Sequence, residues 1–277
     1  MKAHIARLTV EDLPDCLTLA QDRDWRQEEA KWRLLFQLGE VYGARDEDGA
    51  LVGTTILTRH NDSLSAISMV LVASRCGGKG LGRQIMTRVL AEVEQGVTVL
   101  CSTEMGRPLY DKLGFVATGV LHSYVGKLAV DGRHPRRSRV ATPADGPAIV
   151  ALDAEVHGSH RQALVEALTS FALRIRVLER DRVIVGYGAA WQNNEQLVIG
   201  PIIAEDEEAA EVLIREMAED ADGLIRVDIP DRHRDLRDWV QRCGLVEFTA
   251  NALMVRGGSV LPGDRSRWFS PVMQALG

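Results

Sequence analysis

Residues 67–83 decide the fold and read Ile67-Ser68-Met69-Val70-Leu71-Val72-Ala73-Ser74-Arg75-Cys76-Gly77-Gly78-Lys79-Gly80-Leu81-Gly82-Arg83. Residues 67–73 form a mostly apolar run of the length expected for a buried strand. Apolar residues then recur at helical spacing through residues 83–95, which predicts a helix. A strand that leads through a glycine-rich turn into a helix directs backbone N–H groups at an anion, because a helix N-terminus carries partial positive charge. The stretch therefore predicts an α/β protein with a phosphate-binding turn.

The spacing of the glycines separates this turn from two common nucleotide-binding motifs. A P-loop requires Gly-x-x-x-x-Gly-Lys-Ser/Thr, and a Rossmann turn that begins at Gly78 requires glycine where Arg83 stands. Neither pattern is present. A glycine cluster alone is as compatible with a plain turn as with a phosphate-binding turn. Its role is therefore inferred from neighbouring segments of the chain.

Length and composition limit the classes of protein to consider. The chain has 277 residues, 45% hydrophobic and 26% charged, which indicates two soluble domains of about 130 residues each. A formal charge of −6 argues against a nucleic-acid partner, and no apolar run is long enough for a membrane span. The four cysteines have neither CxxC nor zinc spacing, so we expect reduced thiols, no metal site and a cytoplasmic protein.

The two halves of the chain follow similar plans. Thr9 and Asp12 predict a capping box before a helix at residues 11–22, and Thr142 and Asp145 have the same spacing in the second half. Gly53 lies 61 positions before Gly114, and Gly186 lies 58 positions before Gly244. Such recurrence indicates a duplicated domain. We predict a first domain at residues 1–129, a linker at residues 130–139 and a second domain at residues 140–277.

Further elements are expected between these landmarks of the first half. The patterns predict a helix at residues 27–38, a hairpin with strands near residues 41–44 and 51–57, a strand at residues 97–101, a helix at residues 108–113 and an extended segment at residues 115–128. The order is that of a mixed α/β domain.

Two segments together resemble the GNAT superfamily of N-acetyltransferases. The strand Met69-Val70-Leu71-Val72 followed by residues 77–83 is similar to the family's acetyl-CoA motif, Arg/Gln-x-x-Gly-x-Gly/Ala. Residues 103–115, Thr-Glu-Met-Gly-Arg-Pro-Leu-Tyr-Asp-Lys-Leu-Gly-Phe, resemble the family's second CoA segment. The whole chain further resembles bacterial tandem-GNAT proteins with a degenerate second domain. This resemblance implies an α/β (α+β, mixed-sheet) fold of two tandem GNAT-like domains, each with a mostly antiparallel sheet flanked by helices.

The resemblance also implies which residues bind acetyl-CoA, the expected co-substrate. The implied set is Val70, Leu71, Val72, Gly77, Gly78, Lys79, Gly80, Leu81, Gly82, Arg83, Thr103, Gly106, Arg107 and Tyr110. Gly77 departs from the motif, whose first position is Arg or Gln, so Arg75, Lys79 or Arg83 would have to supply a side-chain contact to phosphate. No metal is implied.

The family's reaction, transfer of acetyl to an amine by direct attack, gives these residues roles. A backbone N–H at Val70 or Val72 would bind the thioester carbonyl, and Tyr110, four residues before Gly114, would be the catalytic proton donor. The alternative for Tyr110 is simple packing on Phe115. Because residues 67–70 contain no acid, the general base stays open among Glu104, His60, Glu28 and a water relay.

The second half lacks both functional segments. Acidic residues 205–208 follow the strand-like Ile199-Gly200-Pro201-Ile202-Ile203-Ala204, where negative charge would repel a pyrophosphate, and Val240 stands where the first half has Tyr110. We therefore expect one CoA site per chain. The second half would complete the acceptor pocket, or serve as a packing surface for a homodimer.

The acceptor pocket is the least determined part of the prediction. Trp25, Asp153 and His157 are candidates, because an aromatic ring and an acid suit a cationic amine. Each also has a plainer interpretation: Trp25 as core, Asp153 as helix surface and His157 as a helix end. We expect Arg161 to be an exposed helix residue, Trp239 to pack the second core, and the apolar residues 268–273 to dock on the body.

The resulting hypothesis is an acetyl-CoA-dependent N-acetyltransferase acting on a small-molecule amine. A protein N-acetyltransferase, a non-catalytic acyl-CoA-binding or sensory module, and a scaffold that works through the second domain are the alternatives. The sequence does not identify the acceptor amine.

Overall fold

The computed structural model describes all residues except 1–3, 94, 130–134 and 220. The first half contains β1 (His4–Arg7), α1 (Leu13–Asp22), α2 (Glu29–Leu38), β2 (Glu40–Arg45), β3 (Leu51–Asn61), β4 (Leu64–Val72), α3 (Leu81–Leu90), β5 (Val97–Ser102), α4 (Arg107–Asp111) and β6 (Val116–Gly126). The capping box of Thr9 and Asp12 is present, and a short 3-10 turn at Val10–Asp12 precedes α1. Helix α3 ends at Leu90, earlier than the expected residue 95, because the chain turns there towards β5.

The second half repeats this order. It contains β7 (Ser138–Val140), α5 (Gly146–His157), α6 (Gln162–Phe171), β8 (Arg174–Arg180), β9 (Val183–Asn193), β10 (Gln196–Ile203), α7 (Glu207–Ala218), β11 (Leu224–Pro230), α8 (Arg234–Arg242), β12 (Leu245–Arg256) and β13 (Trp268–Ser270). Part of the expected linker at residues 130–139 lies outside the described residues, and its end is not a linker, because β7 already begins at Ser138. The boundary between the domains stays a prediction.

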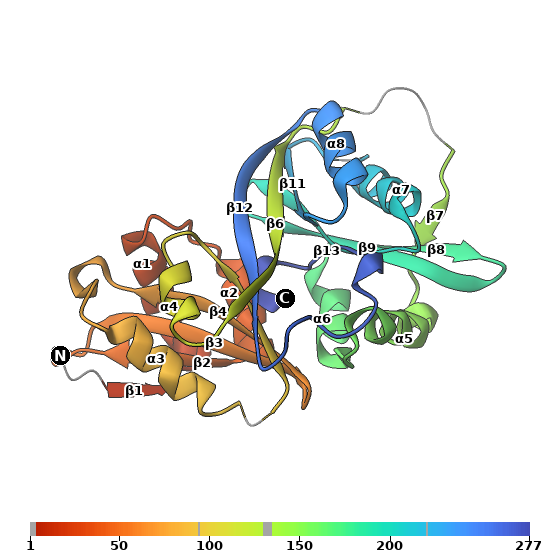
Figure 1. The fold of residues 1–277 in the computed structure, drawn as a ribbon. Helices are drawn as coiled ribbons and strands as arrows, with labels where there is room; N and C mark the ends of the chain where they lie inside the picture. Colours follow the sequence, from red (N-terminus) through yellow and green to blue (C-terminus); the bar gives the residue numbers. More distant parts are fainter. Residues whose placement is uncertain (1–3, 94, 130–134, 220) are drawn as a thin grey trace.

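The strands of the described residues form one continuous sheet with the order β1-β2-β3-β4-β5-β12-β6-β11-β10-β9-β8-β7, and β13 pairs with β10 (Figure 1). The last long strand of each half has changed places. Strand β6 of the first half pairs with β11 of the second, and β12 of the second half pairs with β5 of the first. The two long strands also pair with each other, so they cross the middle of the molecule side by side. The two GNAT-like halves therefore share one mixed sheet flanked by helices.

The first slot is the gap between the parallel strands β4 and β5. These strands are paired from Leu64 and Val97 only as far as Ala66 and Val99, and then they part. Just beyond that point β4 has a bulge, where the register with β3 shifts and Met69 adopts a positive φ of 49°. A bulge bends its strand and leaves one residue out of the regular ladder. The sequence thus opens the sheet immediately before the glycine-rich turn.

The second slot is the corresponding gap between β10 and β11. Their parallel pairing ends at Ile199 and Val227, and the register of β10 with β9 shifts beyond that point. Here the chain fills its own gap, because β13 pairs with Ile202 and Ile203 of β10 and also contacts β11. Trp268 and Phe269 are almost completely buried. The expected docking of residues 268–273 on the body is confirmed.

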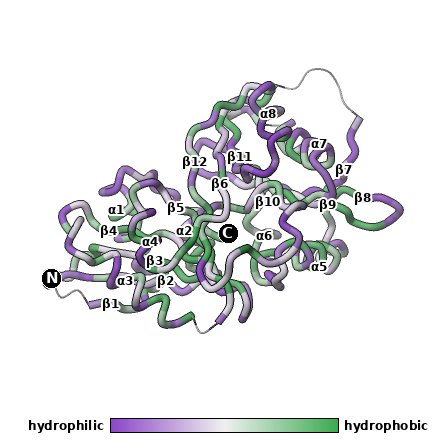
Figure 2. Tube along the Cα trace, in the orientation of Figure 1, coloured by the Kyte–Doolittle hydropathy of each residue, from purple (hydrophilic) through white to green (hydrophobic). Residues whose placement is uncertain are grey.

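Buried hydrophobic residues from strands and helices form the core, whereas hydrophilic segments include much of helix α8 and the turn between β8 and β9 (Figure 2). The helices contribute apolar faces, such as Leu81, Ile85 and Val89 of α3, to these cores. Trp239 is buried in the core of the second half, as expected. Within the described residues no disulfide joins the four cysteines. Beyond β13, the short turn η5 (Gln274–Leu276) packs against β4 and β5, so the tail connects both slots.

Candidate acyl-transfer site

The glycine-rich turn lies at the end of β4 and starts α3. Gly78 and Gly80 have positive φ values of 71° and 79°, a conformation that other residues adopt only with strain. A side chain at either position would meet no protein atom, so the space above both glycines is open to a ligand. Gly77 is exposed and has a negative φ. The N–H groups of Leu81, Gly82 and Arg83 begin α3 and have no acceptor within the helix. This cradle fits a pyrophosphate.

Three basic residues surround the turn, and two of them already have protein partners. Arg75 forms an ion pair with Asp46 at 2.6 Å, and Lys79 Nζ donates to the carbonyl oxygen of Arg75. Arg83 is exposed on the first turn of α3 and forms no ion pair within the described residues. Of the three candidates to replace the motif residue missing at Gly77, Arg83 is therefore the most available.

The second CoA-like segment lies directly beside the turn. A side chain at Gly82 would contact Val72 of β4 and Leu109 of α4, each at 3.4 Å, so the strand, the turn and α4 meet there. Leu71 and Val72 complete β4. Gly106 approaches the ring of Tyr110 closely, while Arg107 is half exposed near Asp111. The structure thus brings together the two segments that are 20 to 30 residues apart in the chain.

Tyr110 lies on α4 against the point where β4 and β5 part. It belongs to one packed cluster with Ile67 and Leu100, the first residues beyond the last β4–β5 pair. Its ring contacts Phe115 edge-on with 6.0 Å between centroids, as the packing interpretation expects. Burial raises the pKa of Tyr110 to about 12, so its hydroxyl keeps its proton at neutral pH. Packing and proton donation are compatible at this position.

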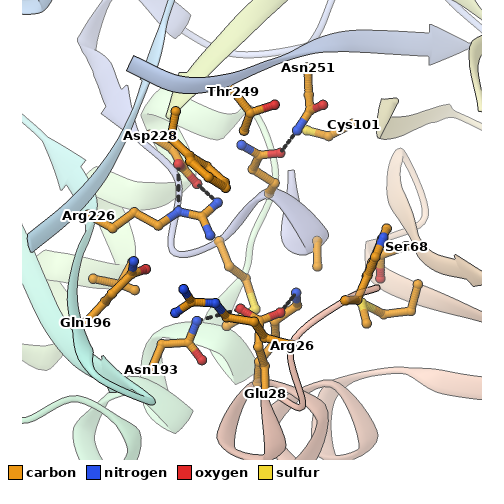
Figure 3. A pocket seen from close by; sticks show the side chains of 18 of the residues that line it. Arg26, Glu28, Ser68, Cys101, Asn193, Gln196, Arg226, Asp228, Thr249 and Asn251 are labelled. Atoms are coloured by element: carbon orange, nitrogen blue, oxygen red, sulfur yellow. Dashed lines mark hydrogen bonds and ion pairs between the residues drawn. The ribbon is translucent and has the colours of Figure 1, made fainter. Parts of the chain in front are cut away.

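The central cavity, of about 520 Å³, lies between the two halves at the open side of the first slot (Figure 3). From the first half its lining includes Trp25, Glu28, Lys31, Ser68, Met69, Cys101 and Thr103. From the second half it includes Trp191, Asn193, Gln196, Arg226, Asp228, Phe248 and Asn251, and the tail adds Met273, Gln274 and Ala275. Thr103, expected to bind CoA, thus lies at the border between the first slot and this cavity.

Two ion pairs lie in the cavity wall. Glu28 is bound by Lys31 Nζ and by the amide of Asn193, so it links α2 to β9. Burial raises the pKa of Glu28, but Lys31 and Asn193 outweigh that effect and hold it below its usual value. On the opposite side Arg226 donates from Nε and Nη2 to the two oxygens of Asp228, both at 3.0 Å. The carboxylate of Asp228 raises the pKa of Arg226 above its ordinary value.

The structure brings one of the three predicted acceptor residues to the cavity. Trp25 lines it and is 37% exposed, so it is not a core residue. Asp153 and His157 are fully buried and are absent from the lining. Asp153 accepts two hydrogen bonds from Arg161 and one from Tyr187. The surface interpretation of Asp153 and the exposed interpretation of Arg161 are both wrong, because the two charges neutralise each other inside the protein.

The candidate bases are also separated by the structure. Glu28 lines the cavity, whereas Glu104 is exposed on the loop before α4. His60 donates from Nε2 to the carbonyl oxygen of Leu276, and burial lowers its pKa to about 3. Among these three side chains, only Glu28 lines the central cavity.

Sequence reasoning missed most of the wall contributed by the second half. Arg226 and Asp228 alternate along β11, so both point to one face of the sheet, and Asn193 ends β9. The alternation was visible in the sequence. The sequence did not show which face of the sheet lies opposite the first slot, because that depends on the exchange of β6 and β12.

The second half lacks the features of the first slot. Asp206 is the N-cap of α7, and its carboxylate accepts from the N–H of Ala209 at 2.8 Å. The helix end that would face a phosphate is therefore already occupied by a negative side chain. Glu205 pairs with Arg180, and Val240 is buried in α8. Strand β13 occupies the second slot.

Comparison with known proteins agrees with this geometry. Residues 25–129 and 149–270 each match a family model described as an acetyltransferase (GNAT) domain. An uncharacterized N-acetyltransferase of Bacillus subtilis (strain 168), YitH, is 28% identical over 99% of this chain and 98% of its own length. A putative acetyltransferase from Pyrococcus horikoshii superposes with a TM-score of 0.85 over 99% of this chain and 96% of its own, at 18% identity.

A tandem GNAT protein from the clavulanic acid biosynthesis pathway is also similar, with a TM-score of 0.65 over 92% of this chain and 98% of its own, at 11% identity. The chain belongs to the GNAT acetyltransferase family and carries two GNAT domains in tandem. Within the described residues, no helix has the length and apolar character needed to cross a membrane.

Proposed function

We propose that the protein is a cytoplasmic N-acetyltransferase that binds acetyl-CoA in the first half and a small-molecule amine in the central cavity. One observation carries the proposal. The first slot has the glycine cradle of Gly78 to Gly82 at one end and, at the other, a cavity lined by both halves that includes charged and polar side chains. When bound, acetyl-CoA supplies an acetyl group on a thioester. The cavity would hold the amine that accepts it.

The residues of the first slot have separate tasks in this proposal. The N–H groups of Gly78 to Arg83 bind the pyrophosphate, with Arg83 as the nearby cation. The bulge at Met69 turns a backbone N–H of Val70 or Val72 towards the thioester oxygen, where it stabilises developing negative charge. Such an arrangement favours transfer because the donors are fixed before the reaction begins.

Proton movement completes the reaction. The acceptor ammonium first gives one proton to water, and its nitrogen then forms the C–N bond as the C–S bond breaks. Tyr110 Oη–H donates a proton to the departing thiolate sulfur. The second proton of the attacking nitrogen passes to solvent, and solvent restores the proton that Tyr110 gives to sulfur. Glu28 stays charged, because Lys31 and Asn193 lower its pKa against the effect of burial. It is therefore better suited to attract the ammonium than to remove its proton.

The test is thiol release from acetyl-CoA by the full-length chain across a panel of small amines and amine-terminated peptides. We expect release with small amines and none with peptides, because the cavity, at about 520 Å³, has the size of a small-molecule pocket. Calorimetry with CoA is run in parallel. Tight CoA binding without thiol release would replace this proposal by the acyl-CoA sensor. Preferential release with peptides would instead favour a protein N-acetyltransferase.

A further inference from the structure

The central cavity has two chemically different ends. Ser68, Met69, Cys101 and Thr103 lie at the first slot, where the reacting amine has to be. Gln196, Arg226 and Asp228 lie on the opposite side, on β10 and β11 (Figure 3). The body of an acceptor that reaches into the first slot with its amine would therefore extend towards the second half. The second half would determine which acceptors bind.

The charges of the lining balance. The acidic lining residues are Asp24, Glu28 and Asp228, and the basic ones are Arg26, Lys31 and Arg226. A pocket for a polyamine would need an excess of acids, because each further ammonium has to be neutralised when it leaves water. A balanced lining instead fits an acceptor that carries both signs of charge.

Arg226 lies at the end of the cavity away from the first slot and has an N–H group available for a ligand. Its Nε and Nη2 are bound to Asp228, and no acceptor for Nη1 is found within the described residues. The side chain is 24% exposed and lines the cavity. Guanidinium groups bind carboxylates through paired N–H donors in a fixed plane. Asp228 holds that plane in place and leaves the Nη1 edge for a ligand.

Two buried polar atoms of the lining also have no hydrogen-bond partner in the part of the chain that the structure describes. Ser68 Oγ at the first slot has none, and its residue is only 8% exposed. Asn193 is 5% exposed, and its Oδ1 has no partner either. Because Glu28 can only accept, the amide of Asn193 must direct its nitrogen to Glu28 and its oxygen elsewhere. A buried polar atom without a partner is costly, so both atoms indicate a polar ligand with N–H or O–H donors.

From these observations we infer that the acceptor is an amine that also carries a carboxylate, as amino acids do, and that Arg226 of the second half binds this carboxylate. Ser68 Oγ then faces the amine end, and Asn193 Oδ1 accepts a hydrogen bond from the acceptor body. This inference rests on the proposed acetyl transfer and names its substrate class. The second half is thus the part of the chain that selects the acceptor.

The experiment compares matched acceptors with the full-length chain. Each α- or ω-amino acid is tested beside its carboxamide and the amine that lacks the carboxyl group, with KM and kcat from thiol release. We expect KM to be about 10-fold to 100-fold lower for the carboxylates, as for one charge-assisted hydrogen-bonded pair. Turnover of the decarboxylated amines with equal or lower KM would overturn the inference while leaving the proposed function intact.

Variants assign the effect to Arg226. Arg226→Gln should raise KM for the carboxylate acceptors about 10-fold to 100-fold and change KM for the carboxamides by less than about 3-fold, with kcat nearly constant. Because Asp228 would lose its partner, the double variant Arg226→Gln/Asp228→Asn, which removes both charges, is measured as well. The exposed Arg33→Gln on α2 is the matched control. Equal effects on carboxylates and carboxamides would contradict a carboxylate contact.

A binding measurement separates this inference from the proposed function. Calorimetric titration of each acceptor into the chain saturated with CoA requires no turnover. Arg226-dependent binding of the carboxylates would support the inference even if no thiol is released, an outcome that removes the acetyl-transfer proposal alone. Absence of a preference for carboxylates in both assays would overturn the inference.

Discussion

The first and second slots are built from equivalent pairs of parallel strands, but the chain treats them in opposite ways. Strands β4 and β5 part after Ala66 and Val99, next to the central cavity. Strands β10 and β11 part after Ile199 and Val227, and β13 occupies the gap. The helix that follows starts at Gly80 in the first half and at the Asp206 cap in the second. The comparison shows how one fold keeps a ligand site or closes it with its own chain.

The largest expected effect concerns the strand that fills the second slot. Trp268→Ala should lower the free energy of unfolding by about 3–5 kcal/mol, because Trp268 is completely buried. Chemical denaturation measures the change. Exposed Trp25→Ala is the control for loss of an indole, and it should cost far less. CoA binding should remain at one molecule per chain, and a second equivalent in the variant would mean that β13 alone closes a competent site.

The glycine cradle provides the next test. Gly80→Asp should weaken CoA binding at least about 10²-fold, because a carboxylate would face the pyrophosphate. Gly80→Asn places a side chain of the same size and similar backbone tolerance at a φ of 79° without the charge, so it separates the steric effect from repulsion. Calorimetry with CoA measures both variants. Undiminished affinity in Gly80→Asp would place the cofactor elsewhere.

Tyr110 tests the chemistry of the first slot. Tyr110→Phe should reduce kcat about 10²-fold while the Kd for CoA stays nearly constant, because the variant removes the proton donor and keeps the ring. Val240→Ala in the second half is the matched control, since it removes apolar packing at the equivalent position and leaves Tyr110 in place. Normal turnover by Tyr110→Phe would contradict proton donation and indicate that Tyr110 only packs.

Acidification should lower the stability of the protein by weakening the packing of β13 in the second slot. His233 donates to the carbonyl oxygen of Trp268 and packs on Phe269, and burial lowers its pKa to about 4. The unfolded chain, with a histidine pKa of about 6.5, binds this proton first, so stability is full above pH 6.5 and falls by up to about 1.4 kcal/mol per pH unit down to pH 4. Denaturation at pH 7.5 and 5.0 measures the loss. His233→Asn should lose less on acidification, and an unchanged slope would contradict this origin.

The smallest effect is expected at the cap of α7. Asp206→Ala should cost about 1 kcal/mol of stability, because one N–H of the first helical turn loses its acceptor. CoA binding should not change, since β13 still occupies the second slot. A small shift in Tm together with unchanged calorimetry is the expected result. Any gain of CoA binding would show that Asp206, rather than β13, is what excludes the cofactor.

Local patterns in the sequence were sufficient for the first slot. Glycines at Gly78 and Gly80 predict a turn that other residues enter only with strain, and the structure has positive φ at both. The acids after β10 predicted a second half without a phosphate loop, and Asp206 indeed caps α7. These features depend on neighbours within a few residues, so spacing alone identifies them.

The acceptor side could not be derived in the same way. Asp153 and Arg161 look like surface residues until the fold pairs them in the interior. Arg226 and Asn193 face the first slot only because strands from both halves share one sheet. The residue types at these positions do not indicate which distant segment lies opposite them in the fold. Their chemistry becomes interpretable once long-range pairing is known.

The exchange of β6 and β12 has a consequence for the order in which the protein is made. One neighbour of β5 is β12, so the edge of β5 stays unpaired until residues 245–256 leave the ribosome. Pairings so distant in sequence form slowly, because a long loop has to close first. A nascent first half therefore waits for the rest of the chain, with an exposed strand edge that can pair wrongly in the meantime. The complete central sheet therefore forms only after both halves have been translated.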